Sequence, residues 1–345
     1  MTTDSPVFGR IALIGIGLIG SSLARAIKRH GGLCRELVAS DASEEALRTA
    51  FALGIVDQTF RDPAAAARGA DLVVLCAPLG SYAAIGKAIA PALHAGAIVS
   101  DIGSTKRSVF ETLTPLLPAG VHLIPGHPVA GTEKSGPENG FANMFENRYC
   151  ILTPDRDACP DALEKVTALW RGTGAIVELM DAAHHDRVLA ITSHLPHLIA
   201  YTIVGTAADL ESQLAREQIE ESGLVRTHEV IRFSAGGFRD FTRIAGSNPV
   251  MWRDIFLANR DAVLEMLGRF TEDLIGLQRA IRFGDGDELY DWFARTREIR
   301  RGVVEMGQAG SFNPLEPGRA AAPPAEIPDG EPSSEQAGAA APKDG

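Results

Sequence analysis

The chain has 345 residues, 45% of them hydrophobic, and a formal net charge of −11 at pH 7. This length predicts about two globular domains, and the acidic balance argues against a nucleic-acid partner because no basic stripe is present to displace counterions from phosphates. Residues 1–9 lack a signal-peptide pattern, no apolar run approaches the length of a membrane span, and the four cysteines show no CxxC spacing, so we expect a cytoplasmic protein with free thiols and no membrane partner.

The first predicted element is a strand that leads into a glycine-rich turn and a helix. An apolar run at 11–14 is followed by Gly15-x-Gly17-x-x-Gly20 and then by apolar residues at helical spacing. In a dinucleotide-binding turn the first glycine makes the tight bend, the second lets the backbone approach a pyrophosphate, and the third lets the helix pack on the strand. A glycine turn in another kind of βα unit is the alternative. The residues expected at the dinucleotide are Gly15, Gly17, Leu18, Ile19 and Gly20.

A second predicted strand, 36–41, ends in an acidic side chain. Asp41 lies about 20 residues after Gly20, where a carboxylate accepts hydrogen bonds from an adenosine ribose. That carboxylate repels a 2′-phosphate, and the next residues offer no arginine to bind one, so we expect the cofactor to be NAD. Asp41 could also cap the helix that begins at Glu44, and both roles could hold.

Short apolar runs alternate with helical stretches through the rest of the first half. The predicted strands are 70–76, 97–101, 121–124, 148–153 and 175–179. The predicted helices are 81–94, 105–117 and 160–172. This alternation predicts βαβ units and a parallel sheet, so the fold class is α/β, with a Rossmann-type NAD-binding domain at 8–180.

From residue 184 onward the pattern becomes helical. One apolar stripe comprises Val188, Ile191, Leu195 and Leu198. A long helix is predicted from Pro249, capped by Asn248, to about Phe283. Its apolar positions exceed what one small helical domain needs, so we expect 181–309 to be an all-α substrate and dimerisation domain of a homodimer. Residues 310–345, rich in Ala, Pro, Gly and Glu, are expected to be a disordered tail.

Ligands of an open parallel sheet bind beyond the carboxyl ends of its strands. Ala77 and Pro78 lie there and are expected to contact the cofactor, and Ser104 follows the strand at 97–101. His127 comes just after another strand, among small, turn-forming residues. A neutral imidazole at the mouth of the cofactor crevice could accept a hydroxyl proton as hydride leaves the same carbon. The alternative is a histidine that only caps a turn.

Two further clusters lie in the helical half. Ser193 and His197 share a small, polar helix face that suits a substrate wall. Nearby histidines at 184, 185 and 194 invite a metal site, but no HExxH pattern or carboxylate cluster accompanies them, so no metal is predicted. Farther on, Arg239 and Arg243, four residues apart, could present a guanidinium fork to a carboxylate, and Asp240 could orient that fork. Surface ion pairs are the alternative for that segment.

Together these motifs resemble the prephenate and arogenate (cyclohexadienyl) dehydrogenases of tyrosine biosynthesis. The matching motifs are Gly15–Gly20, Asp101–Lys106, Gly126–Gly136, Ser193–His197, and Phe238–Arg243 with Trp252. The resemblance spans residue 8 to about residue 308. It implies NAD-dependent oxidative decarboxylation of prephenate to 4-hydroxyphenylpyruvate, or of arogenate to tyrosine, with release of CO2 and NADH.

The resemblance also implies roles for individual residues. His127 would deprotonate the ring hydroxyl while the same carbon passes hydride to the nicotinamide, and Ser104 would hydrogen-bond that hydroxyl or orient His127. Arg243 would hold a substrate carboxylate, and Glu133 is a candidate for distinguishing a keto from an amino group. The residues implied in substrate binding are Thr132, Glu133, Ser193, His197, Asp240, Arg243 and Trp252.

Two other functions fit the glycine motif. A β-hydroxyacid dehydrogenase or imine reductase shares the two-domain plan, but a hydroxyacid enzyme of that type would have a catalytic lysine in the helical half, and 184–310 contains no lysine. A non-catalytic NAD-sensing regulator would have no reason to combine His127, Ser104, His197 and Arg243.

Overall fold

The computed structural model describes residues 5–132, 134–222 and 232–303. Six parallel strands form the main sheet in the order β3-β2-β1-β4-β5-β6. Their bounds are β1 (Phe8–Ile14), β2 (Cys34–Ser40), β3 (Gln58–Phe60), β4 (Leu72–Leu75), β5 (Ile98–Asp101) and β6 (His122–Leu123). This order reverses direction between β1 and β4, which is the switch point at which doubly wound sheets bind nucleotides.

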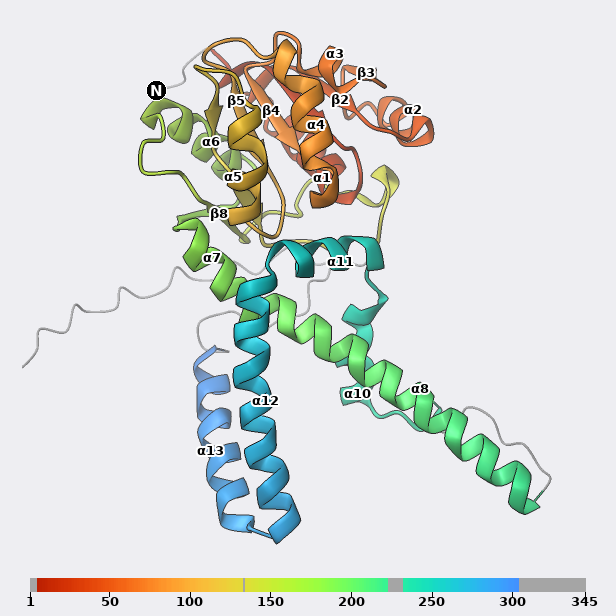
Figure 1. Ribbon diagram of the computed structural model, residues 1–345. Coiled ribbons are helices and arrows are strands. Elements are labelled where there is room, and N and C mark those ends of the chain that lie inside the picture. The colour runs from red at the N-terminus through yellow and green to blue at the C-terminus, as the bar shows by residue number, and fades with distance from the viewer. Residues whose placement is uncertain (1–4, 133, 223–231, 304–345) are drawn as a thin grey trace, which may run out of the picture.

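Helices cover both faces of this sheet (Figure 1). Alternate residues of β1 point to opposite faces, so Ile11 and Leu13 join one core cluster and Ala12 and Ile14 the other. One face packs on α1 (Leu18–His30) and α6 (Pro160–Gly172). The other packs on α3 (Pro63–Ala67), α4 (Tyr82–Ile89) and α5 (Arg107–Leu113), while α2 (Glu44–Ala52) lies beside β3. The predicted strand–glycine turn–helix and the parallel sheet are confirmed.

The last strands of the first half form a separate sheet, which the parallel pattern did not predict. It comprises β7 (Gly126–Pro128), β8 (Tyr149–Leu152) and β9 (Ile176–Leu179), in the order β7-β8-β9. β7 pairs with β8 antiparallel, and β8 pairs with β9 parallel. His127 is therefore the central residue of a strand, paired with Ile151, and does not lie in a turn after a strand. Pro125 hid this strand, because a proline next to a short apolar run indicates a break.

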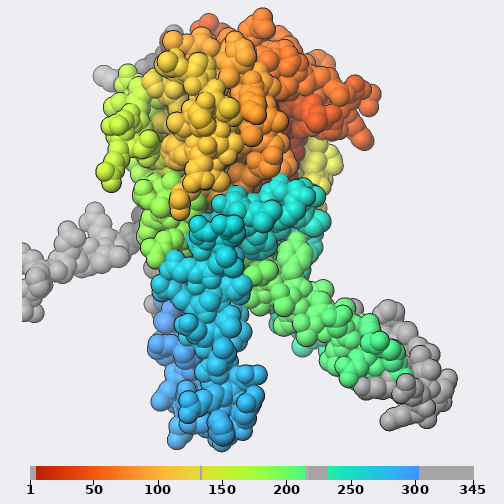
Figure 2. Space-filling model, in the orientation of Figure 1, coloured from red at the N-terminus to blue at the C-terminus, as the bar shows by residue number. Residues whose placement is uncertain are grey.

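The second half is helical, as expected. Its helices are α7 (Ala182–Leu189), α8 (Leu195–Ser222), α10 (Gly236–Thr242), α11 (Pro249–Ala258), α12 (Arg260–Phe283) and α13 (Gly286–Val303). α12 and α13 pair as a hairpin, and α8 extends away from them as a second arm (Figures 1 and 2). The turn between α12 and α13 uses Gly284 at φ 70°, a conformation that glycine adopts without strain.

Two details of the helical prediction are wrong. The predicted stripe from Val188 to Leu198 is not one buried face, because a π-helical turn, η5 (Ala190–His194), shifts the register between α7 and α8 and leaves Ile191 46% exposed. The helix predicted from Pro249 to Phe283 is broken at Asn259, where φ is −110°. The side chain of Asn259 donates instead to the carbonyl of Asp186, 2.7 Å away.

The run Ala182–Leu214 contradicts the expectation that no apolar run approaches the length of a membrane span. It is long and apolar enough to cross a bilayer by length and composition, and only 28% of its most apolar window is buried within the chain. A single helix of this kind is equally typical of a helix that packs against a second protein copy. The expected tail, 310–345, lies outside the described residues.

Candidate active site

The glycine turn has the geometry expected for a dinucleotide. Gly15 has φ +105°, and a Cβ there would lie 2.6 Å from the carbonyl of Cys76 at the end of β4. A Cβ on Gly20 would overlap the carbonyl oxygen of Gly15, so the helix packs tightly on the turn. A Cβ on Gly17, in contrast, would meet nothing within 4 Å. The turn is thus closed on the protein side and open at Gly17, where a pyrophosphate can approach the backbone.

Asp41 lies beside this turn, at the end of β2. Its carboxylate accepts hydrogen bonds from the backbone N–H of Ile16 at 2.8 Å and of Ser43 at 2.8 Å. Ser43, rather than Asp41, caps α2 by accepting from Ala46. Asp41 is partly exposed and can still accept from a ribose hydroxyl. Leu18 and Ile19 open α1, and Ala77 and Pro78 follow β4 directly, so the expected cofactor residues meet at the switch point of the sheet.

A cavity of about 360 Å³ lies between the two halves of the chain. Five of the residues expected at the catalytic or substrate site contribute to its wall, namely Ser104, His127, Ser193, His197 and Trp252. The cavity wall also includes Gly131 and Phe141 from the first half and Met251 and Ile255 from α11. A concave space lined by apolar side chains and several convergent polar groups is typical of a small-molecule site.

His127 is 7% exposed, and its Nδ1 lies 2.9 Å from Nε2 of His185. Burial lowers the pKa of His127 well below the usual value for histidine, and the nearby His185, Lys106 and His194 lower it further. The imidazole is therefore neutral at pH 7. Since Nδ1 is engaged, Nε2 is the nitrogen available to a ligand in the cavity, and a neutral imidazole with a free Nε2 can act as a base.

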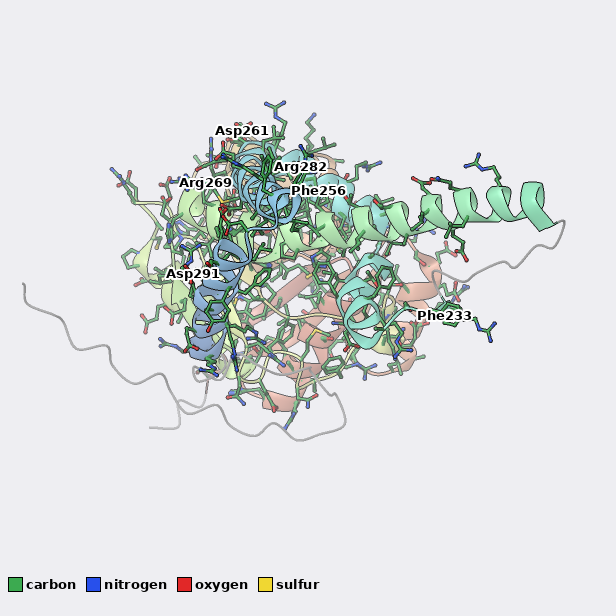
Figure 3. All side chains as sticks on the ribbon, turned by 90° about the horizontal axis from the view of Figure 1, so that it is seen from below. Phe233, Phe256, Asp261, Arg269, Arg282 and Asp291 are labelled. Atoms are coloured by element: carbon green, nitrogen blue, oxygen red, sulfur yellow. The ribbon has the colours of Figure 1, made fainter. Side chains whose placement is uncertain are left out.

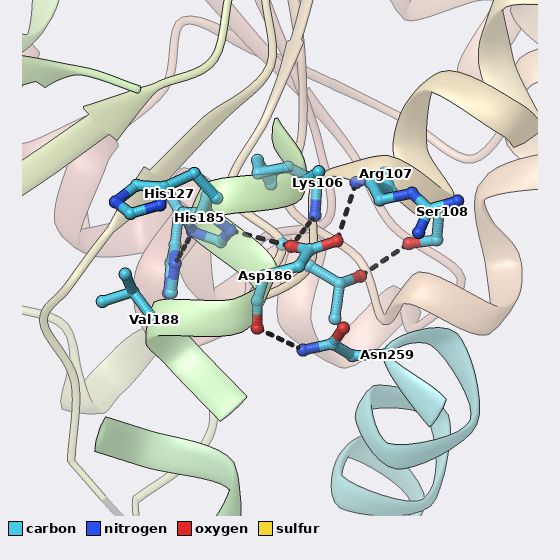
Figure 4. Close-up of polar contacts among 12 residues, drawn as sticks. Lys106, Arg107, Ser108, His127, His185, Asp186, Val188 and Asn259 are labelled. Carbon is cyan, nitrogen blue, oxygen red and sulfur yellow. Dashed lines mark hydrogen bonds and ion pairs between the residues drawn. The ribbon is translucent and has the colours of Figure 1, made fainter. Parts of the chain in front are cut away.

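Behind His127, a chain of buried polar contacts leads away from the cavity (Figure 4). Nδ1 of His185 lies 2.8 Å from Oδ1 of Asp186, and both residues are at most 2% exposed. Asp186 also accepts from the backbone N–H of Lys106 at 2.7 Å and of Arg107 at 3.0 Å. The sequence pattern indicated His185 only as a possible metal ligand and indicated no role for Asp186. Within the described chain, no group of His, Cys, Asp or Glu residues is arranged around a metal site.

A buried ion pair fixes the strand that bears His127. Nζ of Lys106 contacts both carboxylate oxygens of Asp101 at 2.6 and 2.7 Å and donates to the carbonyl of Gly126 at 2.6 Å. Both side chains are fully buried. The hydroxyl of Tyr82 also donates to Asp101, at 3.2 Å. Lys106 thus ties β7 to the end of β5, a function that the motif Asp101–Lys106 did not indicate by itself.

On the helical side, His197 stacks on Trp252 with ring centroids 3.7 Å apart and an interplanar angle of 24°. Burial lowers the pKa of His197, the hydrogen bond that its Nδ1–H donates to the backbone carbonyl of Ser193 raises it, and the nearby charge of Arg243 lowers it. Arg243 is therefore close to the site, although it is exposed on the turn after α10 and is not part of the cavity wall.

The structure does not bring every expected residue into the cavity. Thr132 is partly buried and accepts from Lys134 at 3.3 Å, and Glu133 lies outside the described residues. Asp240 is exposed on α10, and among the described residues it forms no ion pair with Arg243. Conversely, Arg148 belongs to the cavity wall and was missed. It directly precedes the buried strand β8, next to the strand of His127, a position that could have identified it.

The doubly wound sheet, the open glycine turn with Asp41, and a buried neutral histidine facing a helical domain together define a two-domain NAD-dependent dehydrogenase. Comparison with known families matches the chain to the prephenate dehydrogenase nucleotide-binding domain over residues 23–179 and to the prephenate dehydrogenase dimerization domain over residues 181–295. The chain belongs to the prephenate dehydrogenase family.

Individual relatives agree with this assignment. The cyclohexadienyl dehydrogenase of Zymomonas mobilis is 43% identical over 296 residues, covering 85% of this chain and 96% of the relative. The prephenate dehydrogenase of Bacillus subtilis is 33% identical over 298 residues, covering 85% of this chain and 76% of the relative. Among solved structures, prephenate dehydrogenase from A. aeolicus in complex with hydroxyphenyl propionate and NAD+ aligns with a TM-score of 0.76 and 30% identity, covering 86% of this chain and 98% of that one.

Proposed function

We propose that this protein oxidatively decarboxylates prephenate to 4-hydroxyphenylpyruvate, arogenate to tyrosine, or both, with NAD+ as the oxidant. The observation that carries the proposal is His127, a buried neutral imidazole whose free Nε2 faces a cavity shared by the two halves. The name of the Zymomonas mobilis relative supports a substrate with a cyclohexadienyl ring. The A. aeolicus complex with hydroxyphenyl propionate and NAD+ supports an aromatic ligand and NAD+ in a fold of this kind.

NAD+, held at Gly15, Gly17, Gly20 and Asp41, supplies the hydride acceptor when bound. Nε2 of His127 takes the proton of the ring hydroxyl, so the electron pair of the O–H bond forms the new C=O bond as hydride leaves the same carbon. The electron pair of the ring C–COO⁻ bond then enters the ring, CO2 departs, and the carbonyl oxygen regains a proton as the ring becomes aromatic. Aromatisation makes the overall reaction strongly favourable.

The remaining residues of the wall bind and orient the substrate. Ser104 lies on the same cavity as His127 and would hydrogen-bond the ring hydroxyl, and the stacked His197 and Trp252 form an aromatic wall beside Ser193. Arg243, close to the site, would hold a substrate carboxylate, since a guanidinium binds a carboxylate with two parallel hydrogen bonds. Arg148 adds a second basic side chain to the wall. Binding roles for Thr132 and Glu133 remain predictions.

A homodimer in the cytoplasm is part of the proposal. Large apolar side chains are exposed along the helical arms, among them Leu264, Ile275, Ile281, Phe283 and Phe293, each at least 57% exposed. The family match to this half is a dimerization domain, and α8 extends beyond the other described elements when the molecule is seen from below (Figure 3). A second copy would cover these faces. The free thiols Cys34, Cys76, Cys150 and Cys159 suit a reducing compartment.

One assay tests the function directly. NADH formation is followed by absorbance with prephenate, with arogenate, and with a small 3-hydroxyacid, each with NAD+ and with NADP+. We expect turnover with prephenate or arogenate and NAD+, and the ratio of the two kcat/KM values identifies the preferred substrate. Turnover only with the hydroxyacid would favour the rival dehydrogenase class, and no turnover would favour a regulator that binds NAD. Equal use of NADP+ would contradict the role of Asp41.

A further inference from the structure

We propose that His185 and Asp186 form a positioning dyad that holds His127 in the one tautomer able to act as the base. The proposal rests on the proposed function, because the base is needed for deprotonation of the substrate hydroxyl. His127 is part of the wall of the 360 Å³ cavity, whereas His185 and Asp186 are not. They act through His127 and are positioning residues rather than catalytic ones.

The direction of each hydrogen bond follows from Asp186. Its two carboxylate oxygens accept the backbone N–H groups of Lys106 and Arg107 at 2.7 and 3.0 Å. A carboxylate oxygen accepts hydrogen bonds, so His185 donates from Nδ1 across 2.8 Å. A neutral His185 then has a lone pair on Nε2, which must accept the N–H of His127 Nδ1 across 2.9 Å. His127 consequently carries its proton on Nδ1, and Nε2 is the free base.

The same series of hydrogen bonds, from His127 through His185 to Asp186, stabilises the product of proton transfer. When Nε2 of His127 takes the substrate proton, the ring becomes an imidazolium in a buried site, where a charge is costly. Its Nδ1–H still points at Nε2 of His185, which is polarised by the carboxylate beyond it. No proton has to move past His127. The dyad therefore supplies orientation and electrostatic support, and the proton taken from the substrate stays on Nε2 of His127.

Both halves of the chain hold the dyad in place (Figure 4). Lys106 and Arg107 at the start of α5 hold the carboxylate of Asp186, and the amide of Asn259, at the break between α11 and α12, donates to the carbonyl of Asp186 at 2.7 Å. The same amide lies 3.1 Å from Nδ1 of His194. The break at Asn259 thus allows one residue of the helical half to fix the dyad behind the catalytic base. This explains why α11 and α12 are not a single helix.

The dyad also predicts which group limits activity in acid. His127 faces His185, Lys106 and His194, whereas His185 faces Asp186, Asp101 and Lys106. Burial lowers the pKa of both histidines, but the carboxylate of Asp186 opposes this for His185, which therefore protonates first as pH falls. A protonated His185 donates from Nε2 and forces His127 to carry its proton on Nε2. Activity is then lost before His127 itself is protonated.

The test compares three variants of the full-length enzyme, His185→Phe, His185→Gln and the matched control His184→Gln, whose side chain is exposed one residue earlier on α7. For His185→Phe we expect kcat to fall about 100-fold, because a general base loses its fixed tautomer, with KM changed by less than about threefold. His185→Gln keeps an acceptor for Nδ1–H of His127 and should restore kcat to within about tenfold of the parent. The control should match the parent.

Two readouts separate positioning from simple loss of structure. The acidic limb of kcat should move to lower pH in both His185 variants, because the group that titrates first is gone. In the unmodified, 15N-labelled protein, the ring nitrogens of His127 should show a protonated Nδ1 and an unprotonated Nε2 at pH 7, with the His127→Asn spectrum assigning the signals. A protonated Nε2, parent-like kcat in His185→Phe, or a lower kcat with an unmoved acidic limb would each overturn the proposal.

The NMR measurement also separates this inference from the proposed function. If the parent protein fails to turn over prephenate and arogenate, the proposed function is wrong. The NMR measurement of the His127 tautomer then still tests whether the dyad positions His127. If the parent turns over and only the tautomer or the His185 variants disagree, the function stands and the dyad is wrong.

Discussion

The two halves of this chain differ in how they bury their apolar residues. In the nucleotide-binding half, strands such as β4 (Leu72–Leu75) are buried at every position, and two core clusters cover the two sheet faces. In the helical half, large apolar side chains on α12 and α13 remain mostly exposed, Phe283 at 75% and Tyr290 at 72%. The first half completes its core within one chain, whereas the second presents surface that suits a second copy.

The candidate active site lies where these two kinds of structure meet. The base, His127, comes from the self-contained half, while Ser193, His197 and Trp252 come from the half with the exposed faces. The contacts of Asp186 with the backbone of Lys106 and Arg107 join the two halves behind the base, and Asn259 holds Asp186 from within the helical half. The chemistry should therefore depend mainly on the first half, and substrate binding and stability should depend on the second. The predictions below test that division.

The largest effect should come from removing the base in the self-contained half. For His127→Asn we expect kcat to fall at least about 1000-fold, because asparagine cannot accept the hydroxyl proton and general base catalysis contributes about 10²–10⁴-fold. NAD+ affinity, measured by quenching of tryptophan fluorescence, should stay within about twofold, since the glycine turn is separate from β7. Near-normal turnover would refute His127 as the base.

Much of the self-contained half could be predicted from sequence, because its signals are local. The glycine turn, Asp41 and the alternating strands each depend on a few neighbouring residues, and α6 has the predicted bounds of 160–172. The edge strand β3 (Gln58–Phe60) was missed, since three residues without an apolar run give no periodic signal. β7 was missed for a similar reason, because it has three residues, follows Pro125 and ends at Pro128.

The site residues that could be predicted are those whose position is indicated by the sequence immediately around them. Ser104 could be found because it follows β5, and His127 because it follows the apolar run at 121–124, although His127 itself lies within β7. The contact between His127 and His185, in contrast, joins residues far apart in sequence. No periodicity indicates such a contact. The break at Asn259 is another case, because the local sequence favours one helix and a tertiary hydrogen bond to Asp186 overrides that preference.

A charge on the exposed helical face should have the next largest effect. Leu274 and Ile281 are 47% and 67% exposed and lie two turns apart on one face of α12. For the double change Leu274→Arg and Ile281→Arg we expect dimer affinity to fall at least about 100-fold, because two uncompensated charges would be buried against the second copy. Light scattering over a dilution series measures this.

The matched control lies in the other half. Phe51 on α2 is 59% exposed but stands apart from the helical arms, so Phe51→Arg should leave the oligomeric state unchanged. A parent protein that is monomeric at micromolar concentration would contradict the proposal that the helical half is completed by a second copy. Equal loss of dimer affinity in Phe51→Arg and in the double variant of α12 would contradict it as well.

A smaller effect is expected at Arg243, close to the site. Arg243→Gln should raise the KM for prephenate or arogenate about 10- to 100-fold while kcat changes little, because a carboxylate clamp contributes ground-state binding and a charged hydrogen bond contributes about 1.5–3 kcal/mol. The neighbouring Arg239→Gln, also exposed on α10, is the control and should leave KM near the parent value. If kcat fell and KM did not, Arg243 would act in the chemical step instead.

The smallest expected effect concerns stability in acid at the join between the halves. Burial lowers the pKa of His194 to about 4, and the nearby His185 and His197 lower it as well, against the opposing effect of Asp186. In the unfolded chain this histidine would titrate near its ordinary value of about 6.5. Between these two values the unfolded state binds more protons than the folded state, so the free energy of unfolding decreases as pH falls from about 6.5 toward 4.

Replacing His194 should flatten this dependence. For His194→Gln, urea unfolding at a series of pH values should show a loss between pH 7 and 5.5 that is smaller than the parent's by roughly 1 kcal/mol, while the control His94→Gln, at an exposed position, should follow the parent curve. His194 contacts Asn259 and packs edge-on against Trp252, so its burial depends on the helical half staying docked on the nucleotide-binding half. An unchanged slope in His194→Gln would mean that the two halves separate before global unfolding and that the join, rather than either core, is the weakest part of the molecule.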